Sequence, residues 1–313
     1  MAGQNTSILA NDYNIIQSAI SLVMGSGSGT TGYGQTLASS QVGQYAKITV
    51  NQWNNLRSDI VRCRQHQTGV AMGTKAPEDA GYVAGSDMPV ASEAAQIKES
   101  WRAAFLSVSN DCNTNKLTAP PPASQATRSD VVSQQIRTTA WNGRITQTVV
   151  ITFPTADDAR YFFNTGGQFE FQSDRTGGSA GLKNVTWTTM LTNMGTIKFN
   201  YDATTCTGTG VTSSIGYYDI TTSDNLIFEK DAPTGAYTPN KYFIYARRNV
   251  AGNVIYFTIN WWDESAKPPS LPDPGFGIDE DVDGTLTSTI QTFRATGSNV
   301  SISNPGGATT GIA

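Results

Sequence analysis

Ile145-Thr-Gln-Thr-Val-Val-Ile-Thr-Phe153 repeats with a period of two, which is the spacing of side chains along a β-strand. One side of this strand would carry threonines and a valine. The other side would carry the larger and more apolar residues and face a core, namely Ile145, Gln147, Val149, Ile151 and Phe153. Phe153-Pro154-Thr155 closes the strand.

A short helix is expected directly after this strand. Thr155 is placed to cap its first turn, and the charge of Asp158 would meet the positive end of the helix. Asn164-Thr-Gly-Gly167 ends it, because glycine tolerates the left-handed cap conformation. We expect the apolar side of this helix to pack on a sheet through Ala159, Phe162 and Phe163.

Many further strands follow. Asn249–Asn253 reads as the loop of a hairpin, and Lys267–Pro274 reads as an extended connector. In the strand after that hairpin, Ile255, Phe257, Ile259 and Trp261 would share the core face. The expected strands begin at Phe169–Phe171 and continue through Gly195–Asp202, Gly216–Thr221, Leu226–Lys230, Tyr242–Arg247, Val254–Trp261, Gly284–Ala295 and Asn299–Ser303.

The region before residue 118 has helical spacing instead. Apolar residues predict helices over Tyr13–Met24, from Thr49 onward, and over Ser92–Val108. Thr49 and Gln52 match the capping-box pattern, in which each side chain accepts a hydrogen bond from the backbone of the other. Helices this short are marginal alone and need a packing partner.

Together these patterns predict an α+β protein, with a helical N-terminal region followed by a mainly antiparallel, sandwich-like β domain carrying one short helix packed on its sheet. Pro120-Pro-Pro122 cannot continue a helix and indicates a boundary. We expect a helical docking region over residues 1–118, a proline-containing linker over 119–143, the β domain over 144–303 and a flexible tail over 304–313.

Composition excludes several classes of function. Charged residues make up only 15% of the chain and the net charge is −4, so no basic patch is available for nucleic acid. No apolar run is long enough for a membrane helix, and Met1–Ser7 does not resemble a secretory signal. An odd number of widely spaced cysteines argues against disulfides or a zinc site, so Cys63, Cys112 and Cys206 are expected to be free thiols in a chain without a cofactor.

Catalytic arrangements are scarce. His66 is the only histidine, so any Ser-His-Asp or Cys-His design would have to use it. Its place near the end of the second expected helix favours a simpler role as a cation stabilised by the helix dipole. The glycine-rich loop Gly25–Gly34 lacks the Gly-Lys-Ser/Thr ending of a phosphate-binding loop. Sequence alone does not exclude a carboxylate-based glycan hydrolase, because 25 acidic residues offer many pairs.

Asn260-Trp-Trp-Asp-Glu264 combines two aromatics with two acids. Along a strand Trp261 and Trp262 must point to opposite faces, so one belongs to the core and the other is available outside. We predict Trp262 and Tyr218 as contacts for a partner subunit or a glycan, with ordinary packing as the alternative.

A second acidic motif is Asp279-Glu-Asp281-Val-Asp283-Gly284, which resembles the opening of a calcium loop. Asp279, Asp281 and Asp283 are therefore weak Ca²⁺ candidates. Position twelve of such a loop would be Ile290 instead of a bidentate glutamate, so an acidic turn exposed to solvent is the competing interpretation.

Several segments resemble structural proteins of marine and cyanobacterial tailed bacteriophages. These segments are Phe153–Gln168, Val282–Ile290, Arg294–Val300, Asp12–Asn14 and Val50–Leu56. The resemblance implies a virion protein, most simply a tail-associated one such as a baseplate, tail fibre or neck component, and it supplies no catalytic residues.

The expected function is therefore that of a non-enzymatic structural subunit of a virion, made and assembled in the host cytoplasm. Its partners would be copies of itself and other virion proteins, without nucleic acid or membrane. The alternative is a carbohydrate- or receptor-binding module of a phage fibre or surface adhesin, which would bind a host surface glycan through Trp262 or Tyr218.

Overall fold

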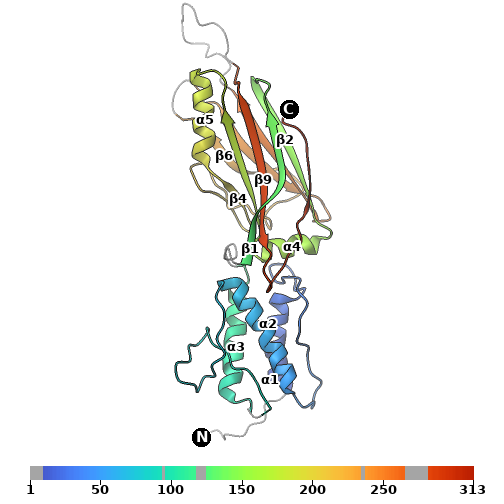
Figure 1. The fold of residues 1–313 in the computed structure, drawn as a ribbon. Coiled ribbons are helices and arrows are strands. Elements are labelled where there is room, and N and C mark those ends of the chain that lie inside the picture. The colour runs from blue at the N-terminus through green and yellow to red at the C-terminus, as the bar shows by residue number, and fades with distance from the viewer. Residues whose placement is uncertain (1–9, 94–95, 118–124, 234–236, 265–280) are drawn as a thin grey trace, which may run out of the picture. The chain divides into compact units, whose positions relative to one another are not determined.

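A computed structural model describes residues 10–93, 96–117, 125–233, 237–264 and 281–313. Five helices and ten strands lie in these ranges, and the strands form two antiparallel five-stranded sheets (Figure 1). The predicted class is confirmed: a helical N-terminal region precedes a mainly antiparallel β region.

The chain divides into two compact units that are each built from several segments. The helical unit contains residues 1–127, 160–166 and 294–303, and the β unit contains residues 128–159, 167–293 and 304–313. These ranges differ from the predicted continuous domains, because two later segments of the chain belong to the helical unit.

Three helices form the body of the helical unit: α1 (Ala10–Met24), α2 (Val50–Thr68) and α3 (Glu99–Thr114). One aromatic side chain from each meets in the core. The Trp53 ring lies edge-on to Tyr13 at 5.4 Å and to Phe105 at 5.2 Å between centroids. Burial of these rings stabilises three helices that would be marginal in isolation.

The predicted start of α2 is confirmed in detail. The backbone N–H of Gln52 donates to Thr49 Oγ1 at 3.3 Å, and the backbone N–H of Thr49 donates to Gln52 Oε1 at 2.7 Å. The helix ends at Gly69, whose φ of 71° is the left-handed conformation that favours glycine.

The third helix begins and ends later than the predicted Ser92–Val108. It starts at Glu99, where an acidic side chain in the first turn is favourable. It continues beyond Val108 because the apolar stripe extends by one turn to Cys112, which is fully buried. Residues 94 and 95, inside the predicted range, lie outside the described residues.

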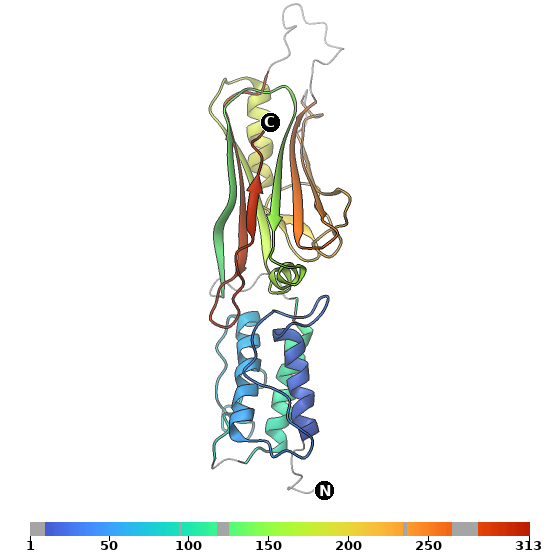
Figure 2. The ribbon, with the colours of Figure 1, turned by 90° about the vertical axis from the view of Figure 1, so that its right-hand side faces the viewer.

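The β unit holds both sheets, which face one another (Figure 2). The first sheet has the order β1 (Ala126–Arg137), β9 (Thr285–Ala295), β3 (Gln168–Thr176), β4 (Ile197–Phe199) and β5 (Thr204–Cys206). The second has the order β10 (Gly306–Thr309), β2 (Gly143–Thr152), β8 (Val254–Asp263), β7 (Lys241–Arg248) and β6 (Asn225–Asp231).

Aromatic rings join the two sheets. Phe257 of β8 contacts Phe169, Phe171 and Phe199 of the first sheet, with centroids 5.6, 4.9 and 5.2 Å away. The predicted core faces are confirmed, since every second residue from Ile145 to Phe153 and from Ile255 to Trp261 is buried. The polar member of these rows, Gln147, donates to the hydroxyls of Ser133 and Thr309.

The predicted proline-containing linker and the predicted flexible tail each contain a strand. The linker predicted over residues 119–143 contains β1, although its prolines at 120–122 lie outside the described residues. The tail predicted over 304–313 contains β10, which pairs with β2 from Gly306 opposite Thr152 to Thr309 opposite Val149. The physical reason is that β2 would otherwise leave a row of backbone groups without partners.

A second helix beyond residue 144 was not predicted. Besides α4 (Ala156–Asn164), this part of the chain contains α5 (Leu182–Met194), so the expectation of one short helix is wrong. Within α4, Thr155 accepts a hydrogen bond from the backbone of Asp158 at 3.1 Å as predicted. The predicted apolar side of α4 is also fully buried, at Ala159, Phe162 and Phe163.

Three predicted strands also need correction. Gly195–Asp202 contains only the short β4, and Asn299–Ser303 contributes only an isolated bridge between Ser301 and Thr296. Gly216–Thr221 forms a turn, in which the carboxylate of Asp219 accepts from the Gly216 backbone at 2.9 Å. This side-chain bond satisfies a backbone group that a strand would have paired. The connector Lys267–Pro274 lies outside the described residues.

Candidate functional site

Trp261 and Trp262 point to opposite faces of β8, as the sequence predicts. Trp261 is fully buried between the sheets, while Trp262 is half-buried on the outer face of the second sheet. The residues opposite Trp262 in the neighbouring strands are Arg144 of β2 and Lys241 of β7. The predicted contact residue therefore lies between two cationic side chains.

Trp262 belongs to a larger cluster on this outer face. The ring of Phe243 lies at its centre, 6.3 Å from Trp262 and 5.6 Å from Tyr245 between centroids, and both contacts are edge-on. Tyr256 continues the row of rings on the same side of β8. We call this cluster the aromatic face and define it as Phe243, Tyr245, Tyr256 and Trp262.

Two arginines accompany these rings. The guanidinium carbon of Arg144 lies 5.3 Å from the Phe243 centroid, and that of Arg247 lies 3.9 Å from the Tyr256 centroid. Both distances are within the range of a cation–π contact. The aromatic face thus presents rings already stacked against planar cations.

The position of Arg144 is fixed by a buried amide. Asn260 is fully buried, and its Oδ1 accepts from Arg144 Nε at 2.9 Å and Nη2 at 2.6 Å. The hydroxyl of Thr146 donates to the same oxygen at 3.0 Å. Because the guanidinium is held by two bonds, little side-chain entropy remains to be lost when it binds a partner.

Acidic side chains lie beside the other cations. Lys241 is 3.4 Å from Glu229 and 3.5 Å from Asp231, and the charge of Glu229 raises the pKa of Lys241. Arg247 is 3.4 Å from Asp224. These pairs are partly exposed and contribute little stability, but they leave a surface of mixed charge around the rings.

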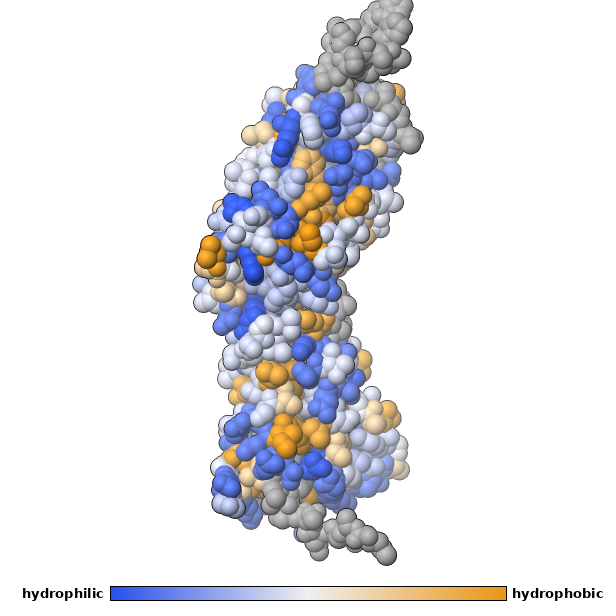
Figure 3. Space-filling view, turned by 180° about the vertical axis from the view of Figure 1, so that it is seen from behind, coloured by the Kyte–Doolittle hydropathy of each residue, from blue (hydrophilic) through white to orange (hydrophobic). Residues whose placement is uncertain are grey.

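An aromatic surface of this kind is suited to recognition. Aromatic residues and arginine are enriched at protein interfaces, and rings held on strands also stack on sugars. Seen from behind, the β unit shows a patch of hydrophobic residues bordered by hydrophilic ones (Figure 3).

Tyr218, the other predicted contact, lies elsewhere in the β unit. It is half-buried in the turn at residues 217–219, outside the strands that carry the aromatic face. Its ring lies 5.1 Å from that of Tyr217, which is buried. Its backbone N–H donates to Tyr201 at 3.1 Å.

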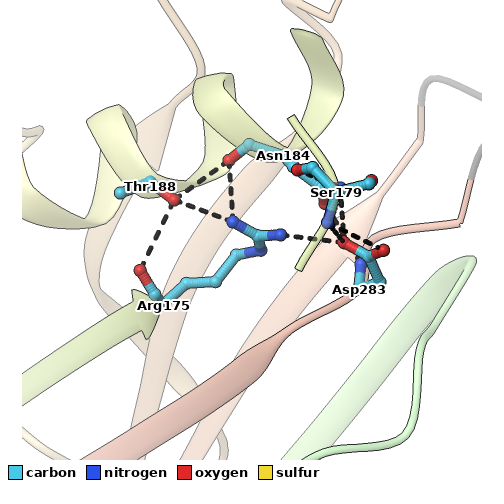
Figure 4. A network of polar contacts seen from close by, with 5 residues as sticks. All are labelled: Arg175, Ser179, Asn184, Thr188 and Asp283. Atoms are coloured by element: carbon cyan, nitrogen blue, oxygen red, sulfur yellow. Dashed lines mark hydrogen bonds and ion pairs between the residues drawn. The ribbon is translucent and has the colours of Figure 1, made fainter. Parts of the chain in front are cut away.

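Asp283, the last acid of the predicted motif, lies in a polar network (Figure 4). The Asp283 carboxylate accepts from Arg175 Nη2 at 3.0 Å, from the backbone of Ser179 at 3.0 and 3.1 Å, and from Asn184 at 2.5 Å. Bonds from Ser179, then the charge of Arg175, lower the pKa of Asp283. Burial lowers the pKa of Arg175, whose bonds to Thr188 and Asn184 anchor it beneath α5.

These contacts bear on the calcium prediction. Asp283 binds hydrogen-bond donors, Asp281 is exposed, and Asp279 lies outside the described residues. Within the described ranges no three His, Cys, Asp or Glu side chains gather where they could hold a metal ion. Calcium binding stays a prediction.

His66 does not have its predicted role. It is buried, its Nε2 lies 3.2 Å from the carbonyl oxygen of Thr165, and its ring meets that of Tyr33 at 5.4 Å. Burial lowers the pKa of His66 to about 4, so the side chain is neutral at pH 7. Loss of hydration outweighs the helix dipole. The three cysteines are free thiols, as predicted.

No protein-family model, curated protein sequence or solved structure matches this chain. Among the described helices, none has the length and apolar character needed to cross a membrane.

Proposed function

We propose that this chain is a non-enzymatic structural subunit of a bacteriophage virion, associated with the tail as a baseplate, tail fibre or neck component. In this proposal the aromatic face binds a neighbouring copy or another virion protein. The observation that carries it is the row of rings on the outer face of the second sheet, in which three half-buried rings surround the buried Phe243, together with the fixed arginine Arg144.

A surface of this kind gains free energy when a partner covers it. Aromatic side chains contribute much apolar area for few rotatable bonds, and they dominate the binding energy of many interfaces. Strands hold these rings in place, so little ordering is needed on association. The low content of charged residues, 15%, also suits a surface that is covered after assembly.

Sedimentation velocity of the purified full chain over a concentration series tests self-association. We expect oligomers, and we expect Trp262→Ala to shift the population toward monomer, by about tenfold or more in dissociation constant if Trp262 is an interface hot spot. Val250→Ala is the matched control, because Val250 is 95% exposed in the β7–β8 hairpin loop, away from the rings. A chain that remains monomeric at high concentration contradicts association between copies.

Electron microscopy of virions labelled with an antibody against this chain tests its location. Label on the tail, baseplate, fibres or neck supports the proposal. Label confined to the head, or virions that carry none, would overturn it.

A second candidate is recognition of a host surface glycan. It is favoured by the neighbourhood of Trp262, where an indole ring lies close to the hydrogen-bond donors of Arg144 and Lys241. Binding on a glycan array that is lost in Trp262→Ala and kept in Tyr218→Ala would support it. The reverse pattern would instead point to the turn at residues 217–219.

A further inference from the structure

A lysine and an aspartate form a buried pair inside the β unit. Lys183, in the first turn of α5, and Asp263, the last residue of β8, have side chains that are 1% and 0% exposed. Lys183 Nζ lies 2.6 Å from Asp263 Oδ2. The pair thus joins a helix to a strand that lies far away in the sequence.

Buried tryptophans flank this pair along α5 and β8. Trp187 follows Lys183 by one helical turn and Trp261 precedes Asp263 on the same side of β8, and both are fully buried. Trp141, 4% exposed, lies edge-on to Trp187 at 5.8 Å. Two charges so far from water are costly, because their mutual attraction rarely repays the loss of hydration.

We propose that Lys183 and Asp263 condense into an intramolecular isopeptide bond. Oδ2 is bonded to the carboxyl carbon Cγ of Asp263, so Lys183 Nζ, at 2.6 Å from Oδ2, also lies near Cγ. Its separation from Cγ is therefore close to the roughly 3–3.5 Å of a reactive pair. Packing on α5 and β8 holds the groups together, so the reaction does not need a collision between them.

The step balances without any co-reactant. A proton passes from the Lys183 ammonium to the Asp263 carboxylate, which gives a neutral amine and a carboxylic acid. The amine nitrogen attacks Cγ, a C–N bond forms, one C–O bond breaks, and the carboxyl oxygen leaves with two protons as water. One positive and one negative charge disappear together, so the net charge of the chain is unchanged and the buried charges are replaced by a neutral amide.

Intact mass of the purified full chain, measured after denaturation, tests the proposal. We expect a mass lower than that of the sequence by one water molecule, and a branched peptide containing Lys183 and Asp263 after proteolysis. Full mass in a chain that is folded by circular dichroism overturns it and leaves a simple buried ion pair.

Variants make the assignment specific. Lys183→Arg and Asp263→Ala should keep the full mass of their sequences, and Asp263→Asn should lose ammonia instead of water if it reacts. Lys241→Arg is the matched control, because Lys241 pairs with Glu229 at 3.4 Å on the partly exposed outer face. Lys241→Arg should still lose one water, since its reacting pair is intact. This control keeps the test informative even if the other variants fold poorly.

A competing reaction has the same mass and must be separated. Asp283-Gly284 is a sequence that can close to a succinimide, also with loss of one water. Peptide mapping distinguishes the two, because a succinimide leaves a linear peptide and is reopened by mild base. Loss of water mapped to Asp283 alone, with Lys183 unmodified, contradicts the isopeptide.

Discussion

His66 illustrates how one buried side chain makes stability depend on pH. The unfolded state binds its proton with a pKa near 6.5, whereas the pKa of the buried ring is about 4. Between these values the unfolded chain carries the extra proton. The contribution of neutral His66 to stability is therefore fully present above about pH 6.5 and is lost as the pH falls toward 4. Over that range the free energy of unfolding decreases by up to about 1.4 kcal/mol per pH unit.

Urea denaturation at several pH values measures this effect. His66→Gln should flatten the dependence between pH 6.5 and 4, since the amide can still donate to Thr165 but does not titrate in that window. An equal slope in the variant and the natural chain would assign the acid sensitivity to other groups.

Arg175 is a buried cation whose charge is balanced by the partly exposed carboxylate of Asp283. Arg175 is 3% exposed, so Asp283→Ala leaves a guanidinium without its carboxylate and should lower the thermal denaturation midpoint. The double variant Asp283→Ala with Arg175→Met should recover part of the loss, because the buried charge is then absent too. Asp281→Ala, at an exposed neighbouring acid, is the control and should have no effect.

Among the elements, β10 offers the clearest prediction. Deleting residues 305–313 uncovers β2 and removes the Thr309 hydroxyl that accepts from Gln147 at 3.0 Å. We expect a loss of roughly 2–4 kcal/mol, at about 1 kcal/mol for each net hydrogen bond, together with aggregation through the open edge. Denaturant titration and light scattering measure both.

A matched change in the same segment is available as control. Gly311→Ala would place its new methyl group in open space and should leave the unfolding free energy unchanged. If the deletion behaves like this substitution, β10 does not stabilise the chain.

Elements with a strong local pattern could be predicted from the sequence, and those with long-range partners could not. The strand at Ile145–Phe153 was found because its alternation lies within the segment itself. Helix α5 was missed because its buried side begins with Lys183 and Asn184, two polar residues that a hydrophobic pattern passes over. Their partners, Asp263 and Asp283, lie about 80 to 100 positions further along, so no local spacing indicates them.

The same limit applies to the candidate site. The opposite faces of Trp261 and Trp262 follow from strand geometry and were predicted. The neighbours of Trp262 could not be predicted, because Arg144 lies opposite it only through the pairing of β2 with β8. A signal was present in Lys241–Arg248, where aromatic residues occupy both faces of one strand. A strand that is aromatic on both sides indicates a surface made for contact.

At the scale of the whole molecule, the helical unit depends on segments from later in the chain. Arg160 donates to the carbonyls of Ser26, Gly29 and Thr31, and Asn164 donates to Gly32 at 3.0 Å. From the last segment, Asn299 accepts from Arg62 at 3.3 Å. All of these residues belong to the same compact unit.

A fragment of residues 1–127 should therefore fail to fold stably. We expect weak near-ultraviolet circular dichroism and rapid proteolysis, whereas the full chain should resist protease. The protease resistance of Arg160→Ala in the full chain should lie between that of the fragment and that of the natural chain. Its free energy of unfolding should fall by about 2–4 kcal/mol, because the lost hydrogen bonds are made by a charged group. A fragment that unfolds as cooperatively as the full chain contradicts this dependence.

This arrangement also matters during synthesis. The ribosome synthesises helices α1 to α3 before residues 294–303, which complete the same unit and follow the end of α3 by about 180 positions. The nascent helices keep incomplete surfaces until this later segment has been translated, so their unit cannot finish folding before residues 294–303 have emerged from the ribosome. Nascent chains stalled before codon 294 should accordingly be held by chaperones that the finished protein no longer attracts.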